Sequence, residues 1–131
     1  MSVNRAFRLP LRNALVGIGA LLLAATAIAA NPASALELIM FGKNGCVWCA
    51  RWEREVGRAY PEAEEAQIAP LRRLDIREQD GAGLELQEPV IYTPTFVLVD
   101  EGAEVGRITG YQSESEFWAR LDDMLPQRQQ R

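Results

Sequence analysis

The chain has 131 residues, of which 14 are Lys or Arg and 18 are Asp or Glu, so its formal net charge is −4. It contains no histidine, which excludes catalysis by a Ser-His or Cys-His pair and every histidine-based metal site. An acidic surface repels phosphate backbones, and we therefore expect no nucleic-acid partner.

Residues 1–35 have the composition of a signal peptide. They contain no acidic residue, and a positively charged start precedes an apolar run over residues 14–30. Pro32 ends this run, and residues 33–35 (Ala-Ser-Ala) form the small-x-small pattern that signal peptidases recognise. We predict a signal peptide at 1–35 that is cleaved before Leu36. An uncleaved membrane anchor is the alternative, because the apolar run is close to the shortest length that spans a bilayer.

The rest of the chain is predicted to form one domain at 36–126 and a flexible tail at 127–131. The tail follows a proline and contains no apolar residue. The leader contains three arginines, Arg5, Arg8 and Arg12. Without them, 11 of the 14 basic residues remain against all 18 acidic ones, and the net charge becomes −7. This charge favours solubility and identifies no partner.

The first half of the domain reads as strand, helix, strand. Residues 37–41 (ELIMF) are a short apolar run of the kind found in buried central strands. The two cysteines then open a helix with an expected apolar stripe of Trp48, Trp52 and Val56. We expect a separate short helix at 61–67 that starts with proline, and a second strand at 71–76.

The second half reads as a β-hairpin followed by a helix. A loop or short helix is expected at 80–86, and strands at 95–99 and 104–109 are expected to pair as a hairpin with Gly102 in the turn. Ser113 and Glu116 fit a capping box for the last helix. The apolar stripe of this helix consists of Phe117, Leu121 and Leu125, joined by Trp118. The order of elements predicts a three-layer α/β sandwich.

Cys46 and Cys49 are the only cysteines, and three functions compete for them. A structural disulfide would close a loop of only four residues, worth roughly 2 kcal/mol on the chain-entropy estimate. Structural zinc needs four Cys or His ligands, and this chain has two in total. We therefore favour a redox-active pair, with the structural bridge and a metal site shared between chains as alternatives.

The redox interpretation has a positive physical argument. If Cys46 lies at the start of a helix, unpaired backbone N–H groups and the helix dipole favour its thiolate. Lys43 is a candidate for a further stabilising cation, and Cys49, one turn later, is within bridging distance and is the candidate resolving thiol. The glycines at 42 and 45 leave the approach to Cys46 open.

A second motif is Tyr92-Thr93-Pro94-Thr95, directly before the predicted hairpin. Proline cannot donate a hydrogen bond to a sheet, so it marks the start of a strand. Together with the Cys-x-x-Cys helix, this motif resembles the thioredoxin superfamily over the whole predicted domain. The resemblance implies a minimal, glutaredoxin-like four-stranded mixed sheet flanked by helices and a cis Thr93-Pro94 bond. It also implies that Thr93 and Pro94 bind an extended substrate peptide, and Trp48, between the cysteines, is a further candidate contact.

Within this superfamily, three stretches resemble the periplasmic thioredoxin-like proteins of sulfur-oxidation (Sox) clusters, the SoxS-like group. They are residues 46–76, residues 93–111 and the aromatic start of the last helix (EFWARL). The resemblance implies a periplasmic reductase of protein disulfides, a sulfur-carrier protein among them. Electrons would come from a membrane thiol transporter, and we expect a monomer without a cofactor.

The chain departs from thioredoxin itself at the site. Gly45 stands before Cys46 where thioredoxin has tryptophan, and the residues between the cysteines are Val-Trp. Met40 stands where thioredoxin has a buried carboxylate, which leaves the general base for Cys49 unidentified; Glu53 and Glu55 are candidates by proximity alone. Two other functions stay open, a disulfide oxidase or isomerase and a non-catalytic binding module.

Overall fold

The computed structural model describes residues 36–126. The signal peptide predicted at 1–35 and the tail predicted at 127–131 lie outside this range. Within it, every helix is too short or too polar to span a membrane.

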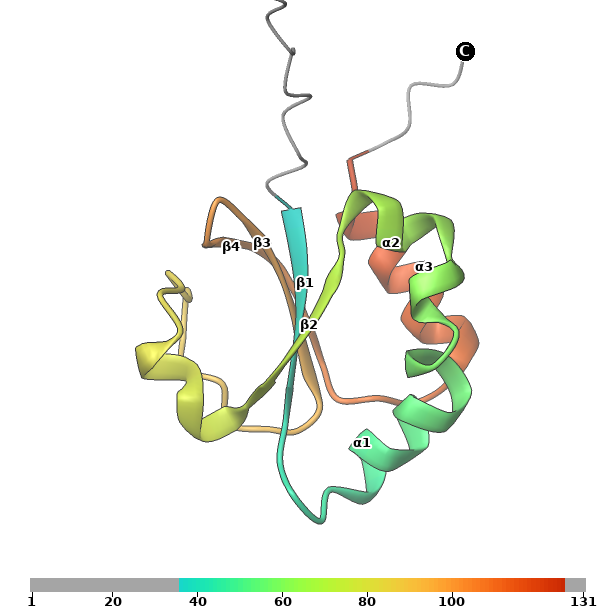
Figure 1. Ribbon diagram of the computed structural model, residues 1–131, viewed down its shortest axis with the longest axis horizontal. Coiled ribbons are helices and arrows are strands. Elements are labelled where there is room, and N and C mark those ends of the chain that lie inside the picture. Colours follow the sequence, from blue (N-terminus) through green and yellow to red (C-terminus); the bar gives the residue numbers. More distant parts are fainter. Residues whose placement is uncertain (1–35, 127–131) are drawn as a thin grey trace, which may run out of the picture.

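A mixed four-stranded sheet forms the centre of the domain (Figure 1). Its strands, in the spatial order β2-β1-β3-β4, are β1 (Leu36–Gly42), β2 (Leu71–Asp75), β3 (Thr95–Asp100) and β4 (Ala103–Thr109). β1 runs parallel to β2 and antiparallel to β3, and β3 pairs with β4 as an antiparallel hairpin. The hairpin turn contains Glu101 and Gly102, both with positive φ (50° and 85°), as a type I′ hairpin turn requires.

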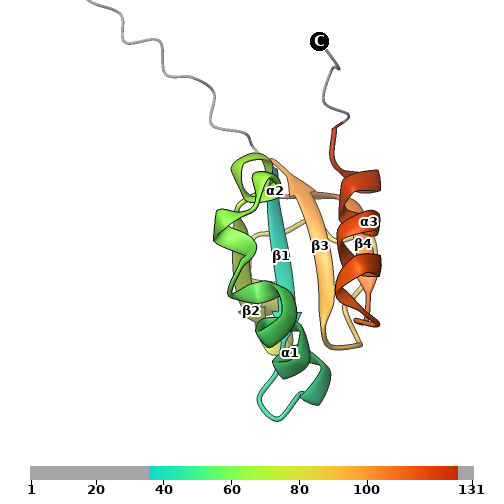
Figure 2. The ribbon, with the colours of Figure 1, turned by 90° about the vertical axis from the view of Figure 1, so that its right-hand side faces the viewer.

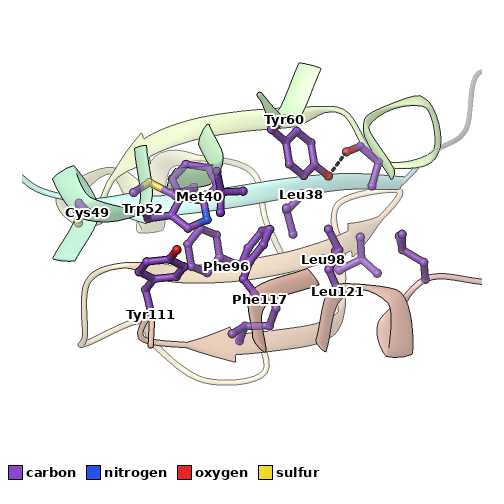
Figure 3. Packing of buried hydrophobic residues seen from close by; sticks show 14 residues of the cluster. Leu38, Met40, Cys49, Trp52, Tyr60, Phe96, Leu98, Tyr111, Phe117 and Leu121 are labelled. Atoms are coloured by element: carbon purple, nitrogen blue, oxygen red, sulfur yellow. Dashed lines mark hydrogen bonds between the residues drawn. The ribbon is translucent and has the colours of Figure 1, made fainter. Parts of the chain in front are cut away.

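All three α-helices lie on one face of the sheet (Figures 1 and 2). They are α1 (Val47–Trp52), α2 (Glu64–Ile68) and α3 (Glu114–Met124), and two short segments, η1 (Glu53–Gly57, a π-helix) and η2 (Tyr60–Glu62, a 3-10 helix), connect α1 to α2. Leu38 and Met40 of β1 point to this face. They pack there against Trp52 of α1 and Phe117 of α3 in the main core (Figure 3).

The opposite face is covered by η3 (Ile76–Gly81), a 3-10 helix, and the loop that follows it. Alternate residues of the central strands form a second, smaller core with Val90 of this loop; these residues are Ile39, Phe41, Val97 and Val99. Because β1 and β3 are buried on both faces, they read as unbroken apolar runs. The predicted thioredoxin-like sandwich is confirmed, with a turn-rich third layer.

Two details of the predicted helices were wrong. The helix expected at 61–67 is a 3-10 turn around Pro61 followed by α2, because Ala63 is extended (φ −75°, ψ 152°) and interrupts the helix. Trp48 does not join the buried stripe of Trp52 and Val56, since 52% of its surface is exposed. Ser113 caps α3 as predicted, and its hydroxyl accepts a hydrogen bond from the Glu116 N–H (3.3 Å).

Candidate active site

The site begins where β1 ends and the chain turns into α1. Gly45 has a φ of +75°, a conformation that other residues rarely adopt, and the Cys46 N–H donates to the Lys43 carbonyl (3.3 Å). Cys46 is itself the N-cap of α1, with extended backbone angles (φ −75°, ψ 106°). The turn therefore places the Cys46 sulfur at the start of the helix, as the sequence predicts.

Cys46 and Cys49 form a disulfide, with their Cα atoms 5.2 Å apart. The Cys49 N–H donates a hydrogen bond to the Cys46 sulfur (3.1 Å). Cys46 is partly exposed, whereas only 8% of the Cys49 surface is exposed. Cys46 is therefore the more accessible of the two sulfur-bearing residues, and Cys49 is the buried one.

A hollow of about 210 Å³ brings together the three residues that the sequence analysis assigned to substrate binding. Trp48, Thr93 and Pro94 line it, with residues 110–112 on the remaining side. The Thr93-Pro94 peptide bond is cis. The Gly110 N–H donates to the Pro94 carbonyl (2.8 Å), which ties the end of β4 to the start of β3 at this point.

A second cavity, of about 640 Å³, is lined by both Cys46 and Cys49. Met40 and Lys43 line it, together with Glu53 and Arg73, whose side chains form a two-point ion pair (2.5 and 2.8 Å). This hydrogen bond to Glu53 raises the pKa of Arg73. The thioether of Met40 cannot accept the Cys49 proton at neutral pH. Of the two candidate bases, Glu53 and Glu55, Glu53 is the one that lines this cavity with Cys49.

Lys43 enters the site through its backbone carbonyl, and a role for its amino group as a thiolate stabiliser stays a prediction. Glu55, the other candidate base, lies in a different network. It accepts hydrogen bonds from Tyr111 (2.5 Å) and Arg51 (2.9 Å), and these two bonds lower its pKa. Burial and the Glu55 carboxylate raise the pKa of Tyr111.

Sequence reasoning missed Arg51 and Tyr111. The i,i+4 spacing of Arg51 and Glu55 is a readable signal for a helical ion pair, whereas the contact with Tyr111 joins residues 56 positions apart. Within residues 36–126, no group of three or more Cys, Asp or Glu residues is arranged to hold a metal ion.

A mixed sheet with helices packed on it, a Cys-x-x-Cys disulfide at a helix start and a cis Thr-Pro bond before the neighbouring strand define the class of thiol–disulfide oxidoreductases with a thioredoxin fold. A family model described as the thioredoxin-like domain matches residues 23–125. The chain therefore belongs to the thioredoxin-like family, and it is a thiol–disulfide oxidoreductase. A search of the curated proteins finds no match.

Among solved structures, the chain is similar to the periplasmic thioredoxin SoxS from Paracoccus pantotrophus in its reduced form. The identity is 45% and the TM-score 0.65, over 68% of this chain and 94% of that one. The thioredoxin from Malassezia sympodialis (16% identity, TM-score 0.54, 70% of this chain and 78% of that one) shares the fold. So does the thioredoxin NaTrxh from Nicotiana alata (23% identity, TM-score 0.54, 71% and 76%). The similarity to SoxS supports the SoxS-like group that the sequence resembles.

Proposed function

We propose that this protein is a periplasmic reductase that keeps cysteines of other periplasmic proteins reduced, in the service of a sulfur-oxidation system. The observation that carries the proposal is the asymmetry of the bridge, with a partly exposed Cys46 and a buried Cys49. Trp48, which lies between the two cysteines in the sequence, lines the hollow at Thr93 and Pro94. The 45% identity to a periplasmic SoxS supports the compartment and the sulfur-oxidation link. The predicted signal peptide at 1–35 agrees with this compartment.

The reaction consists of two thiol–disulfide exchanges. The Cys46 thiolate attacks one sulfur of the substrate disulfide, forms a mixed disulfide and releases the other substrate sulfur as a thiolate. The Cys49 thiolate then attacks the Cys46 sulfur, which forms the Cys46–Cys49 bridge and releases the second substrate thiol. Two electrons pass from the dithiol to the substrate, and the released thiolates take up the two protons that the cysteines lost.

Three parts of the site assist these exchanges in the proposed mechanism. The Cys49 N–H, 3.1 Å from the Cys46 sulfur, stabilises negative charge on that sulfur, and Lys43 adds a positive charge to the same turn. Thr93 and Pro94 present the backbone against which an extended substrate segment lies. Afterwards, a thiol transporter of the membrane reduces the bridge again.

An insulin-reduction assay tests the reductase activity. The wild-type domain, supplied with dithiothreitol, should precipitate insulin much faster than dithiothreitol alone. Cys46→Ser should abolish this activity, because its oxygen cannot form the mixed disulfide. The proposal fails if wild type adds nothing to the rate of dithiothreitol alone, or if Cys46→Ser keeps the activity.

A trapping experiment then addresses the compartment and the substrates. The Cys49→Ala variant, expressed with its leader, should accumulate in the periplasm as mixed disulfides with other proteins, since nothing resolves them. The matched control is the double variant Cys46→Ser, Cys49→Ala, which should form none. Adducts with components of a sulfur-oxidation system are expected; adducts confined to unrelated proteins would contradict that assignment and leave the reductase activity intact.

A further inference from the structure

Arg51 contacts two aromatic rings that line the hollow at Thr93 and Pro94. Its guanidinium carbon is 5.6 Å from the centre of the Trp48 ring and 5.8 Å from the centre of the Tyr111 ring. Both distances are within the range of cation–π attraction. Because Trp48 and Tyr111 both line the hollow at Thr93 and Pro94, Arg51 connects two of the side chains that form its walls.

Glu55 fixes Arg51 and Tyr111 at the same time. One carboxylate oxygen accepts from the Arg51 Nε (2.9 Å), and the other accepts from the Tyr111 hydroxyl (2.5 Å). Tyr111 is itself held by the main chain, since it follows Gly110, whose N–H donates to Pro94. The contacts thus form a continuous chain from the Thr93-Pro94 turn through Tyr111, Glu55 and Arg51 to Trp48.

Trp48 needs such a support because 52% of its surface is exposed and it is not part of the core. Among the aromatic and cation–π contacts of residues 36–126, Trp48 takes part in the one with Arg51. An exposed indole without a fixed neighbour samples several rotamers on a nanosecond timescale. In the structure, the ring lies against the Arg51 guanidinium and forms a wall of the hollow.

We propose that Arg51 and Tyr111, linked by Glu55, are positioning residues that hold Trp48 as a wall of the substrate hollow and thereby favour protein disulfides over small ones. The inference rests on the proposed reductase function. A protein disulfide brings flanking residues that fill the hollow, so its binding depends on where Trp48 lies. A small disulfide reaches Cys46 without filling the hollow, and its reaction is independent of this network.

Steady-state kinetics with two substrates test the proposal. Arg51→Gln should raise the KM for insulin about two- to fivefold, the range that an exposed cation–π contact predicts, with little change in kcat. Its rate with hydroxyethyl disulfide, a small uncharged substrate, and its reduction potential should equal those of wild type. Tyr111→Phe, which removes only the hydroxyl, should shift the insulin KM in the same direction.

Two controls separate positioning from a general structural role. Arg58→Gln removes the same charge from an exposed residue in the turn that follows η1, and it should behave as wild type. In a Trp48→Ala background, Arg51→Gln should have no further effect on the insulin KM, because the residue that it positions is gone. A parallel loss with both substrates, or a full Arg51→Gln effect without Trp48, would overturn the proposal.

Side-chain relaxation provides a readout that does not depend on activity. The order parameter of the Trp48 indole N–H, measured by ¹⁵N NMR, should fall in Arg51→Gln and remain high in Arg58→Gln, while that of the buried Trp52 stays unchanged. An unchanged order parameter for Trp48 contradicts the positioning role even if the enzyme is active. A wild-type protein that does not reduce insulin refutes the reductase function instead, and the NMR result still decides the positioning.

Discussion

At the scale of single residues, the chemistry depends on how one sulfur is hydrogen-bonded. The Cys49 N–H donates to the Cys46 sulfur at 3.1 Å, and Cys46 caps a helical stretch that continues from α1 into η1. A hydrogen bond to the charged form of a group favours that form. In the reduced protein, the same N–H is therefore expected to lower the pKa of the Cys46 thiol.

We predict that the pKa of Cys46 lies below about 8.5, the ordinary value for a free cysteine. The rate of iodoacetamide alkylation, followed against pH in the Cys49→Ala variant, measures it, because this substitution keeps the backbone N–H and leaves one thiol. Lys43→Gln in the same background should raise the pKa if the amino group contributes. An alkylation rate that titrates at the ordinary value would contradict the thiolate mechanism.

Site residues could be predicted from the sequence where their partners lie close along the chain, and they were missed where the partners lie far apart. Cys46, Trp48 and Cys49 belong to one helical turn, and Thr93 and Pro94 are adjacent, so local patterns were enough to name them. Tyr111 contacts Glu55 across 56 positions, and nothing in either segment indicates that contact. Its position follows only from the pairing of β3 with β4, which brings Gly110 next to Pro94.

At the scale of elements, one buried ion pair attaches the loop before the Thr93-Pro94 turn to β4. Glu104 accepts hydrogen bonds from the Arg107 side chain (2.7 and 2.8 Å) and from the Gln87 N–H (2.8 Å). Arg107 also donates to the Glu88 carbonyl (2.7 Å). Burial by itself would raise the pKa of Glu104, but the bonds from Arg107 and Gln87 outweigh it, and the pKa is lowered.

Glu104→Gln should therefore destabilise the domain at pH 7 by at most about 3 kcal/mol, the cost of removing one partner of a buried ion pair, because Arg107 keeps the more distant Glu88 carboxylate (3.7 Å). Because the folded pKa is lowered, this stabilisation is fully present above the ordinary value of 4.5 and is lost as the pH falls through the folded pKa. The difference between variant and wild type should thus shrink on going from pH 7 to pH 3.

Urea unfolding at both pH values, followed by far-UV circular dichroism, measures this difference. Glu62→Gln removes the same charge from an exposed residue of η2 and should leave the stability close to that of wild type. If the Glu104→Gln difference is equally large at pH 3, the ion pair is not its cause.

The strands were predictable from the sequence because β1 and β3 are apolar on both faces, and α3 because its cap and stripe are local. The π-helical segment η1 could not be predicted from the sequence. It is stabilised by a distant residue, since Arg73 of β2 pairs with Glu53 and donates to the Gly57 carbonyl (3.3 Å). A Cβ at position 57 would also lie 2.7 Å from the Trp52 ring, so the close packing of this turn requires glycine.

At the scale of the whole molecule, the direction of the redox reaction is linked to the difference in stability between the oxidised and the reduced protein. A thermodynamic cycle equates two free energies. One is the difference in unfolding free energy between the oxidised and the reduced protein. The other is the difference between the folded and the unfolded chain in the free energy of forming the disulfide. A reductase stabilises its own disulfide on folding, so its oxidised form is the more stable one; in a strong oxidant the reduced form is more stable.

Two opposing terms set the size of this difference here. Closing a four-residue loop in the unfolded chain favours the oxidised form by about 2 kcal/mol. The Cys46 thiolate favours the reduced form, and because its folded pKa is lowered, this contribution is present at high pH and disappears as the pH falls through that pKa. We therefore predict that the oxidised protein is more stable by at most about 2 kcal/mol, and that the difference is larger at pH 5 than at pH 8.

Urea unfolding of the oxidised and reduced protein at both pH values measures the difference, and far-UV circular dichroism avoids quenching of the tryptophans by the disulfide. The urea midpoint should be higher for the oxidised protein, with an unchanged slope. The double variant Cys46→Ser, Cys49→Ser should show no dependence on reductant. A higher midpoint for the reduced protein would mean that the fold drives the bridge open, and the domain would then be an oxidant of its partners instead of their reductant.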